Sequence, residues 1–542
     1  MAKEYIMTDV LIIGNGIAGL CAAYEAASRG ISVTVVSKGD GRASPEVMGL
    51  NAPVHPGDNE ELFYQDILCS GMELNNKNLA KTLASQSIRQ ISKLEGLGLV
   101  FDRNPDGTYH TLRALGNTFP RLVHNGSLTG AKSIDILTAH CKMRGVQFLE
   151  GIRILDLLVE RGRVRGAVGL MSNQEFLVFG AKAVVMATGG SSNIHRISTY
   201  PKGLVGDGYA MAYRAGAELI DMEFLQFEPC CFVIPESLQG HLIVTTMLNE
   251  GGRLLNGRGE EFLTRDGNGF KIQKSELSRK IFEEAASGRG TPHGGVYYDV
   301  TKVPRERLVV DHSIFYEPAL QAGVDLTQVP GEVAPAAHTF LGGIRINEHC
   351  ETSLDALFAA GEVTGGVHGA NRLGGCAGTE IYVFGTIAGQ SAGRCAVESD
   401  PMDEKRLSEL AEPLRENHFS LLNSPSKHID LCRILDELHG AVETGLGICR
   451  DGPSMKSSLK KLDQIQACQV TELAGKETGL RYNLENILLN ARLQLRAGLQ
   501  RTESRGVFYR TDYPDTDDIN WKKNLLLKQE KGECKIGLLD TN

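Results

Sequence analysis

The sequence has no Cys-x-x-Cys pair, although it contains 12 cysteines in 542 residues. Zinc and iron–sulfur sites usually draw ligands from such closely spaced pairs, so we expect no metal site in this chain. The scattered cysteines, with no secretory leader before them, are typical of reduced thiols in a cytoplasmic protein. The adjacent Cys230 and Cys231 are most simply two small buried residues.

Long apolar runs are also missing. No segment approaches the roughly 18 to 20 apolar residues that a helix needs to cross a bilayer. The apolar start, "YIMTDVLIIGNGIAGL", is broken by glycines at the spacing of a turn. It therefore predicts a strand followed by a loop, not a signal peptide.

The chain lacks an excess of positive charge and is poor in aromatic residues. It has 57 Lys and Arg against 66 Asp and Glu, a formal net charge of -9, and 6% aromatics. Without basic runs, nucleic acid is excluded as the main partner, and a small molecule is expected instead.

What the chain has in abundance is glycine, with 62 against 18 prolines, which indicates many tight turns and close backbone contacts.

The first forty residues have the pattern of a nucleotide-binding βαβ unit. A strand over 9–13 leads into "GNGIAG", a helix follows, and a second strand ends at Ser37. Gly14, Gly16 and Gly19 suit a tight turn, a close approach of backbone to pyrophosphate, and close packing of helix on sheet. This loop alone does not separate FAD from NAD. Ser37 either caps its strand or offers a hydroxyl to the adenosine ribose.

Further along, the pattern of the chain changes three times. Short β-branched runs over 146–185 predict an antiparallel insertion that returns to the parallel sheet. Residues 231–334 mix polar loops with short helices, as a separate cap or substrate domain would, and strands resume over 335–400. After Pro401 the apolar residues recur at spacings of three and four, which predicts helices.

A series of ordered motifs runs through the chain: "GNGIAGLCAAYEA", "MATGG", "GDGYAMAYRAGAELIDMEFLQF", "NEGGRLLNGRGEEF", "HTFLGGIRIN", "LFAAGEVTGGVHGANRLGG" and "RTESRGVFYRTDYPD". Through them, the sequence from Asp9 to Trp521 resembles the succinate dehydrogenase/fumarate reductase flavoprotein family, which includes L-aspartate oxidase. The resemblance implies an α/β fold with a two-dinucleotide-fold FAD domain (1–230 and 335–400), an inserted α+β capping domain (231–334) and a C-terminal helical domain (401–542). It also implies an oligomer or hetero-complex, with a possible iron–sulfur electron-transfer partner.

The same resemblance implies which residues contact FAD. They are Gly14, Gly16, Ala18, Gly19, Ser37, Lys38, Gly39, Ala187, Thr188, Gly189, Asp207, Glu362, Ala377 and Gly378. Asp207 and Glu362 would accept hydrogen bonds from ribityl or ribose hydroxyls, or else cap turns. Family members with a covalent flavin carry a histidine in the loop after the second strand. No histidine occurs between Met1 and Val54, so we expect non-covalent FAD.

The dicarboxylate site of the family is only half preserved. The family draws a histidine from "QFHPTG", an arginine proton donor from "RGEGG", a histidine from "HYxMGGI" and an arginine from "GANRLG". Here His338 and Arg372 match the last two, whereas Glu228 and Leu248 stand at the first two. Leu248 has no proton to give, and a dicarboxylate needs two cationic anchors.

Four residues are therefore candidates for catalysis: Arg372, His338, Glu228 and Arg253. Arg372 would hold a substrate carboxylate or pair with Glu362, and His338 would contact the carboxylate or be a core residue. Glu228 could serve as an acid or base, bind a substrate ammonium, or pair with Arg253. His368 is a weaker candidate.

We therefore expect an FAD-dependent oxidoreductase that transfers a hydride at flavin N5 to or from a small carboxylate other than plain fumarate or succinate. Three alternatives stay open. One is an amino-acid oxidase similar to L-aspartate oxidase, with Glu228 as the ammonium partner. Another is a flavin-bearing electron-transfer subunit that works with an iron–sulfur protein. The third is a non-catalytic regulator that binds the flavin.

Overall fold

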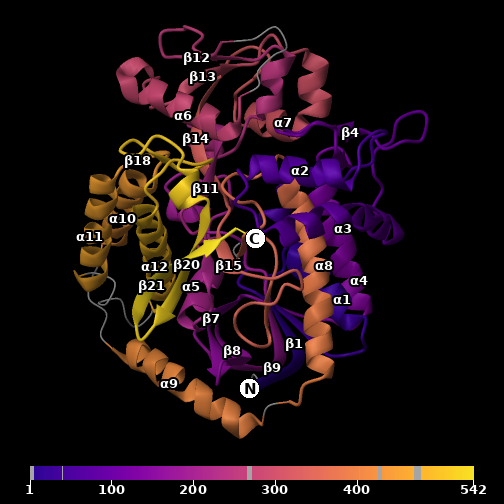
Figure 1. Cartoon of the computed structure of the whole chain (residues 1–542), viewed down its shortest axis with the longest axis vertical. Helices are drawn as coiled ribbons and strands as arrows, with labels where there is room; N and C mark the ends of the chain where they lie inside the picture. The colour runs from indigo at the N-terminus through magenta and orange to yellow at the C-terminus, as the bar shows by residue number, and fades with distance from the viewer. Residues whose placement is uncertain are drawn as a thin grey trace.

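The computed structural model describes residues 5–39, 41–264, 272–401, 403–424, 430–468 and 478–541. They form a large sheet domain, a smaller domain above it, which we call the cap, and a C-terminal part on the flank of the sheet domain (Figure 1). The cap lies at the top of the view with α6 (Lys274–Glu284) and α7 (Ser313–Gln321) on its outside.

The main sheet of the large domain has the strand order β6-β2-β1-β9-β8-β7. Its strands are β6 (Gln147–Glu150), β2 (Val33–Ser37), β1 (Tyr5–Ile13), β9 (Phe176–Met186), β8 (Arg163–Met171), β7 (Ile152–Glu160) and β16 (Leu357–Ala359), which pairs with β9. The strands from β6 to β9 are parallel, while β8 and β7 run antiparallel. The predicted antiparallel insertion is thus confirmed, and the parallel half places the ends of β1, β2 and β9 along one edge.

Two helices lie directly on the parallel half of this sheet, α1 (Ile17–Ala27) and α8 (Cys376–Val397). Around them, α4 (Thr129–Met143) packs on α1, α3 (Lys77–Gly96) on α8 and α2 (Glu60–Ser70) on α3, while α5 (Asp207–Arg214) packs on β7. The long α8 lies against α1 (Figure 1). A Cβ atom on Gly389 would lie 2.3 Å from the carbonyl oxygen of Ala22. Glycine in α8 therefore lets the two helices approach backbone to backbone.

A four-stranded antiparallel sheet runs through the cap, in the order β11-β14-β13-β12, with β12 and β13 at its top in Figure 1. Its strands are β11 (Leu225–Phe232), β14 (Gly331–Phe340), β13 (Val296–Asp299) and β12 (Arg253–Leu255). The chain enters the cap along β11 and leaves it along β14, so both strands span the junction with the sheet domain. The cap has a hydrophobic core of its own, which includes Leu248, Leu254 and Tyr298.

The C-terminal part begins with helices, as predicted, but ends in a β-hairpin that was not predicted. The helices are α9 (Glu404–Asn423), α10 (Leu431–Leu446), α11 (Gly452–Cys468), α12 (Thr478–Gln500) and α13 (Asp518–Trp521). The hairpin strands β20 (Lys523–Glu530) and β21 (Glu533–Asp540) extend a sheet with β10 (Leu219–Ile220), β15 (Gly343–Arg345) and β17 (Thr364–Gly365). The end of the chain is thereby part of the large domain.

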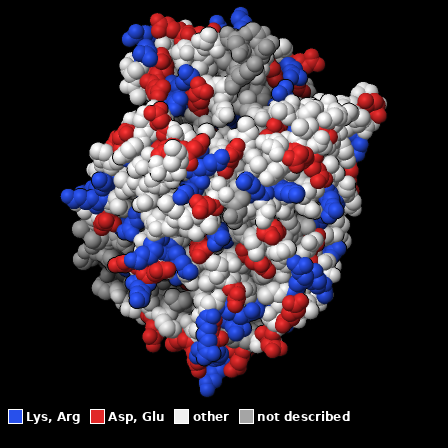
Figure 2. Space-filling model, viewed as in Figure 1, with Lys and Arg blue, Asp and Glu red and all other residues white. Residues whose placement is uncertain are grey.

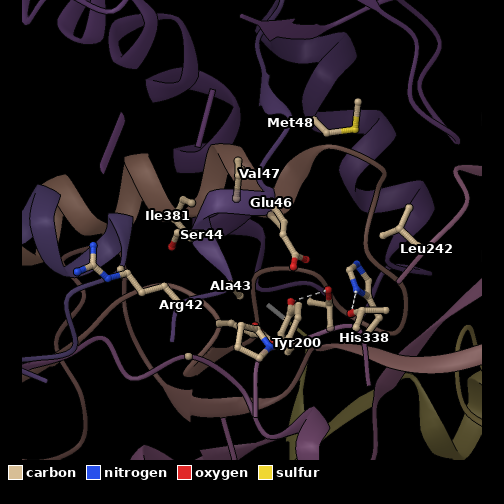
Figure 3. A pocket seen from close by; sticks show the side chains of 18 of the residues that line it. Arg42, Ala43, Ser44, Glu46, Val47, Met48, Tyr200, Leu242, His338 and Ile381 are labelled. Carbon is tan, nitrogen blue, oxygen red and sulfur yellow. Dashed lines mark hydrogen bonds between the residues drawn. The ribbon is translucent and has the colours of Figure 1, made fainter. Parts of the chain in front are cut away.

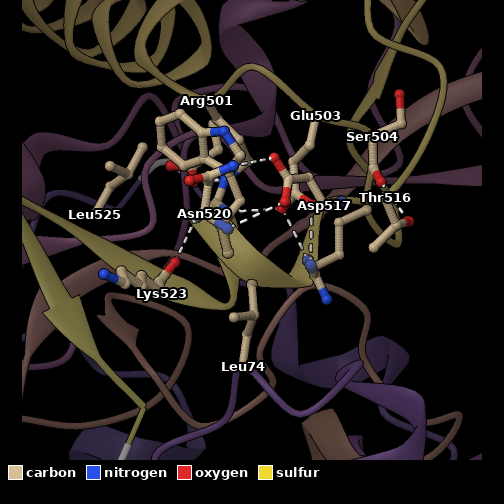
Figure 4. Close-up of polar contacts among 12 residues, drawn as sticks. Leu74, Arg501, Glu503, Ser504, Thr516, Asp517, Asn520, Lys523 and Leu525 are labelled. Atoms are coloured by element: carbon tan, nitrogen blue, oxygen red, sulfur yellow. Dashed lines mark hydrogen bonds and ion pairs between the residues drawn. The ribbon is translucent and has the colours of Figure 1, made fainter.

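A buried ion network fixes this junction, and Arg501 is its centre (Figure 4). Its guanidinium donates to Glu223 at 2.7 Å and to Glu503 at 2.9 Å. It also donates to the carbonyl oxygens of Trp521 and Lys523. The motif "RTESRG" therefore joins the end of α12 to the start of the hairpin.

The remaining strands of the described chain are short. Strands β3 (Gly49–Asn51), β5 (Leu122–His124) and β4 (Thr111–Leu112) form a small sheet, and β18 (Cys449–Arg450) pairs with β19 (Tyr509–Arg510).

Acidic and basic side chains are interspersed over the face of the molecule seen in Figure 2, so neither sign of charge dominates there. Within the described ranges, no helix combines the length and the apolar character that crossing a bilayer requires.

Candidate active site

A cavity of about 1330 Å³ opens where β1, β2 and β9 end and continues beneath the cap. Ligands of open α/β sheets bind at this carboxyl edge of the strands. Of the residues predicted to contact FAD, all but Gly19 line the cavity. Three of the four predicted catalytic residues, Glu228, His338 and Arg372, line it as well.

The turn after β1 leaves no room for a side chain. Gly14 has φ +115°, and a Cβ atom there would lie 2.1 Å from the carbonyl oxygen of Ala187 at the end of β9. A Cβ on Gly19 would meet the carbonyl oxygen of Gly14 at the same distance. Gly19 thus packs the helix onto the turn, while Gly14 and Gly16 face the cavity with their backbone.

Two buried hydroxyl groups on the cavity wall have no hydrogen-bond partner within the described chain: Ser37 Oγ after β2 and Thr188 Oγ1 after β9. Helix α1 begins beside them at Gly16, whose position offers no capping side chain. The amides of a first helical turn and unpaired hydroxyls together suit a pyrophosphate and its sugar. The residues present therefore fit a dinucleotide such as FAD.

The cavity wall also supplies acids and a second helix terminus. Asp207 accepts hydrogen bonds from Lys38 at 2.6 Å and from Asn486 at 2.8 Å. Ala377 and Gly378 lie in the first turn of α8, where backbone amides lack partners within the helix. Glu362 accepts the backbone N–H of Phe340 at 2.8 Å, and burial raises its pKa to about 8. This carboxyl is thus largely protonated at neutral pH.

Arg372 lies on the cavity wall with its side chain almost enclosed, since only 8% of the residue is exposed. Its Nη2 donates to Gln226 Oε1 at 2.9 Å and to Thr339 Oγ1 at 3.4 Å, both neutral acceptors. Its Nε is buried without a hydrogen-bond partner. Among the described residues, no carboxylate lies within 4.0 Å of the guanidinium, Glu362 included. The predicted pairing with Glu362 is therefore wrong, and the charge of Arg372 is uncompensated at contact distance.

His338 reaches the cavity through an irregularity in strand β14. The register shifts between the pairs Gln226–Thr339 and Phe227–Ala337, which leaves His338 as an extra residue on its strand. Its Nδ1 lies 2.7 Å from Thr199 Oγ1, and Figure 3 shows the ring beside Tyr200. Burial first, and then the charges of Arg372 and Lys274, hold the pKa of His338 well below its usual value. His338 is therefore a neutral imidazole at neutral pH.

Glu228 forms an ion pair that the sequence did not reveal. It is only 2% exposed, and its Oε2 lies 2.5 Å from Nζ of Lys274, the first residue of α6 in the cap. The same oxygen lies 3.9 Å from Nε2 of His338. Lys274 lines the cavity and keeps 24% of its side chain exposed. Glu228 on β11, His338 on β14 and Lys274 on α6 thus meet at one point of the cavity wall.

The structure places two sequence candidates, Arg253 and His368, outside the cavity, together with Leu248, which stands where the family has its arginine. Arg253, in β12, pairs with Asp299 at 2.6 Å and does not line the cavity. Leu248 lies in the hydrophobic core of the cap. His368 is hydrogen-bonded to Glu380 at 2.9 Å, which leaves it behind the wall rather than in it. The expectation that Arg253 joins the site or pairs with Glu228 is therefore wrong, because its partner lies on the neighbouring cap strand.

The loop after β2 closes the cavity from the other side. Figure 3 shows Arg42, Ser44 and Glu46 of this loop around the space that His338 and Tyr200 face. Ser44 Oγ accepts the backbone N–H of Ile17 at 3.1 Å and so ties the loop to the start of α1. The carboxylate of Glu46 points toward the same space.

A family model described as an FAD binding domain matches residues 9–377, and one described as the fumarate reductase flavoprotein C-term matches residues 435–541. The chain belongs to the fumarate reductase/succinate dehydrogenase flavoprotein family. The expected fold class, the FAD cofactor and the assignment to the oxidoreductases are thereby confirmed.

Known relatives of this flavoprotein align over nearly its whole length. One, a subunit of the CoM/CoB fumarate reductase of Methanothermobacter marburgensis, is 37% identical over 99% of this chain and 100% of its own. L-Aspartate oxidase of Streptomyces coelicolor is 30% identical, with coverage of 96% and 92%. A solved structure of Escherichia coli quinol fumarate reductase superposes with a TM-score of 0.91 at 28% identity, covering 99% of this chain and 97% of that one.

Sequence reasoning overlooked Lys274 in this flavoprotein. The sequence that ends on it, "LTRDGNGFKIQK", has the composition of a polar loop, and nothing in its spacing points toward the strands of the large domain. Two signals were present. Lys274 begins a short helix in the stretch where short helices were predicted, and Glu228 is a charged residue inside an apolar strand that needs a cation close by.

Proposed function

We propose that this flavoprotein is an oxidoreductase acting on the carbon–carbon bond next to the carboxylate of a small substrate other than plain fumarate or succinate. The observation that carries the proposal is Arg372, a buried guanidinium in the cavity that contacts neutral acceptors and has an unpartnered Nε. A carboxylate is the natural ligand of such a fork. Thr339 and Gln226 hold the guanidinium in place.

The charges around Arg372 support a substrate with one carboxylate. His338 is neutral, Glu362 is largely protonated, and the charge of Lys274 is balanced by Glu228. Arg372 therefore remains as the one uncompensated cation among these five groups. A single anchor of this kind matches a monoanion better than a dianion.

Lys274 is the residue that we assign as the proton donor. When bound, FAD supplies the hydride or accepts it. Nζ of Lys274 carries three donor hydrogens, of which Glu228 takes one, so others are left to face the cavity. In the reductive direction Lys274 would place a proton on the substrate carbon next to the one that receives the hydride. Leu248 has no proton to donate, and Arg253 lies outside the cavity.

We propose that FAD is held without a covalent bond. The described residues of the loop after β2 that line the cavity are Lys38, Gly39, Gly41, Arg42, Ala43, Ser44, Glu46, Val47 and Met48. None of these nine is a histidine. Acid precipitation of the yellow protein should leave the flavin in the supernatant, whereas a yellow pellet would contradict the proposal.

Electrons would reach the flavin through a partner. The Methanothermobacter relative is a subunit by its name, which supports a partner subunit for this chain, and we propose that this partner carries iron–sulfur centres. The described cysteines are all free thiols, which suits a cytoplasmic location. An amino-acid oxidase fits less well, since the carboxylate of Glu228 that would hold an ammonium is already paired with Lys274.

The test is a binding and reoxidation series on the FAD-loaded chain. Crotonate should reoxidise the reduced flavin, and butyrate should perturb the absorption of the oxidised flavin. Arg372→Gln should weaken butyrate binding by about 30-fold to 150-fold, since hydrogen bonds to charged groups are worth roughly 2–3 kcal/mol. Arg253→Gln, which lies outside the cavity, is the matched control and should bind butyrate as the wild type does. Equal binding by both variants would overturn the proposal.

A further inference from the structure

We propose that Glu228 is the specificity-determining residue of this site, because its carboxylate neutralises Lys274 and repels a second carboxylate on the substrate. The proposal rests on the proposed function, in which Arg372 holds the first carboxylate. It goes beyond that function by naming the residue that limits the site to monocarboxylates. It also predicts that one substitution opens the site to dicarboxylates.

The geometry places Glu228 where a second carboxylate would lie. On β11, Gln226 and Glu228 are two residues apart and therefore point to the same face of the strand. Gln226 contacts Arg372, so Glu228 stands one strand step away from the carboxylate anchor. Lys274 reaches the same point from the cap. A substrate held by Arg372 and extending along β11 thus meets Glu228 and Lys274 with its other end.

The charge of Glu228 decides what that other end can be. The carboxylate is nearly fully buried, so its field is weakly screened by water. A second carboxylate would gain the attraction of Lys274 only by competing with Glu228, and it would also meet the repulsion of Glu228 itself. A neutral polar or apolar end has neither problem. His338 cannot help the dianion, because it is uncharged.

Replacing Glu228 by glutamine removes the negative charge and keeps the shape of the side chain. Lys274 then loses its counter-charge and becomes a second cationic anchor beside Arg372. The variant therefore should bind a four-carbon dicarboxylate more tightly than the wild type does. Affinity for the four-carbon monocarboxylate should change little, since its uncharged end has no charge for Lys274 to attract.

The experiment measures the binding of butyrate and succinate to the FAD-loaded full chain from the change in flavin absorption. The wild type should bind butyrate at least about tenfold more tightly than succinate, since like charges brought together at a buried site weaken binding strongly. Glu228→Gln should reverse the preference, with succinate binding at least about tenfold tighter than in the wild type and butyrate within about threefold.

Two further variants make the result specific. Glu332→Gln is the matched control, because Glu332 is also a buried cap-sheet glutamate but pairs with His293 outside the cavity. It should keep the wild-type preference. Lys274→Gln, which leaves Glu228 unpaired, should bind succinate even more weakly than the wild type. Should Glu228→Gln fail to fold, Lys274→Gln still tests the proposal, because the change expected for it is weaker rather than tighter binding of succinate.

Each outcome has a defined meaning. Equal binding of butyrate and succinate by the wild type, or a Glu228→Gln variant that keeps the wild-type ratio, overturns the role of Glu228. The proposed function stands in either case if Arg372→Gln still weakens butyrate binding. If neither acid perturbs the flavin of the wild type, or if Arg372→Gln binds both unchanged, the proposed function fails, and the inference that rests on it fails too.

Discussion

Nζ of Lys274 lies 2.5 Å from Oε2 of Glu228, and this contact joins the first residue of a cap helix to a strand shared with the large domain. The pair lies on the wall of the cavity that also holds Arg372. A cation and an anion far apart in the sequence thereby become one element of the site.

The proton-donor role proposed for Lys274 leads to a prediction about rate. Lys274→Gln should slow reoxidation of the reduced flavin by crotonate about 10²-fold to 10⁴-fold, the usual range for loss of a general acid. Butyrate should still bind within about tenfold of wild type, because the carboxylate anchor is kept. Lys274→Arg should restore part of the rate, as it keeps a charged donor. Stopped-flow absorbance gives the rates, and a titration gives the binding.

Lys280→Gln is the matched control for Lys274. Lys280 lies on the same helix, α6, with 44% of its side chain exposed and only a distant pairing with Glu276. The reduced flavin of Lys280→Gln should be reoxidised by crotonate at the wild-type rate. A Lys274→Gln variant that reduces crotonate as fast as Lys280→Gln would show that the proton comes from elsewhere.

Gly14 is predicted to be indispensable for FAD binding. Gly14→Ala places a methyl group 2.1 Å from the carbonyl oxygen of Ala187, at a backbone conformation that side chains rarely adopt. The turn must shift, and the purified variant should contain less than about a tenth of the flavin of the wild type, which corresponds to a loss of more than about 1.4 kcal/mol at limiting FAD. The flavin content is measured as the ratio of the absorbance at about 450 nm, near the visible maximum of the flavin, to the protein concentration.

Gly96→Ala is the control, since Gly96 ends α3 with no positive φ and with nothing within 4 Å of the place where the added methyl group would lie. It should retain a full complement of flavin. If Gly14→Ala also retained it, the turn after β1 would not be the site of close approach between backbone and cofactor.

Glu362 makes stability depend on pH. Burial raises its pKa from 4.5 in the unfolded chain to about 8 in the folded one, so the folded state binds the extra proton between these values. The stabilisation is complete below pH 4.5 and is lost as the pH rises through about 8. Glu362→Gln resembles the protonated form and should escape this loss. It should match the wild type at pH 5 and exceed it at pH 9 by on the order of a few kcal/mol.

Denaturant unfolding of both chains at pH 5 and pH 9 checks this prediction. The quantity that matters is the change with pH of the difference between the two free energies of unfolding, because other groups titrate equally in both chains. A difference that is the same at both pH values would contradict a raised pKa for Glu362.

Arg501 is predicted to hold the C-terminal hairpin in place. Arg501→Gln leaves the carboxylate of Glu223 buried without its ion-pair partner, whereas Glu503 keeps its pairing with Arg505, and the change should lower the free energy of unfolding by about 3–5 kcal/mol. Arg433→Gln removes an exposed pair with Glu437 and should cost less than about 1 kcal/mol. Urea denaturation compares them, and a wild-type midpoint for Arg501→Gln would refute the role of the network.

Most of the residues that line the cavity at the strand ends could be predicted from the sequence, since they belong to local turns. The glycines of "GNGIAG", Ser37 at the end of the second strand and Thr188 after "VVM" all lie at strand ends, and parallel strands bring their ends to one edge. Of the residues expected to contact FAD, Gly19 is the one that does not line the cavity. It packs the helix onto the turn because its position faces Gly14.

The positions of the candidate catalytic residues could be predicted only where a motif fixed them. His338 and Arg372 line the cavity as expected, whereas Arg253 pairs with Asp299 and Leu248 lies in the hydrophobic core of the cap. Sequence spacing does not tell which face of a short cap strand meets the large domain. The bulge at His338 and the return of β14 beside β11 decide it.

The sequence by itself determined the βαβ unit, the order of the motifs and thus the family and its flavin, because these depend on residues close together in the chain. The tertiary structure alone decided that Lys274 meets Glu228 and that Arg372 does not meet Glu362. The C-terminal hairpin beside β10 is a third such case. Each of these depends on how segments tens to hundreds of residues apart pack, and the charge of a side chain at one position does not reveal its partner at another.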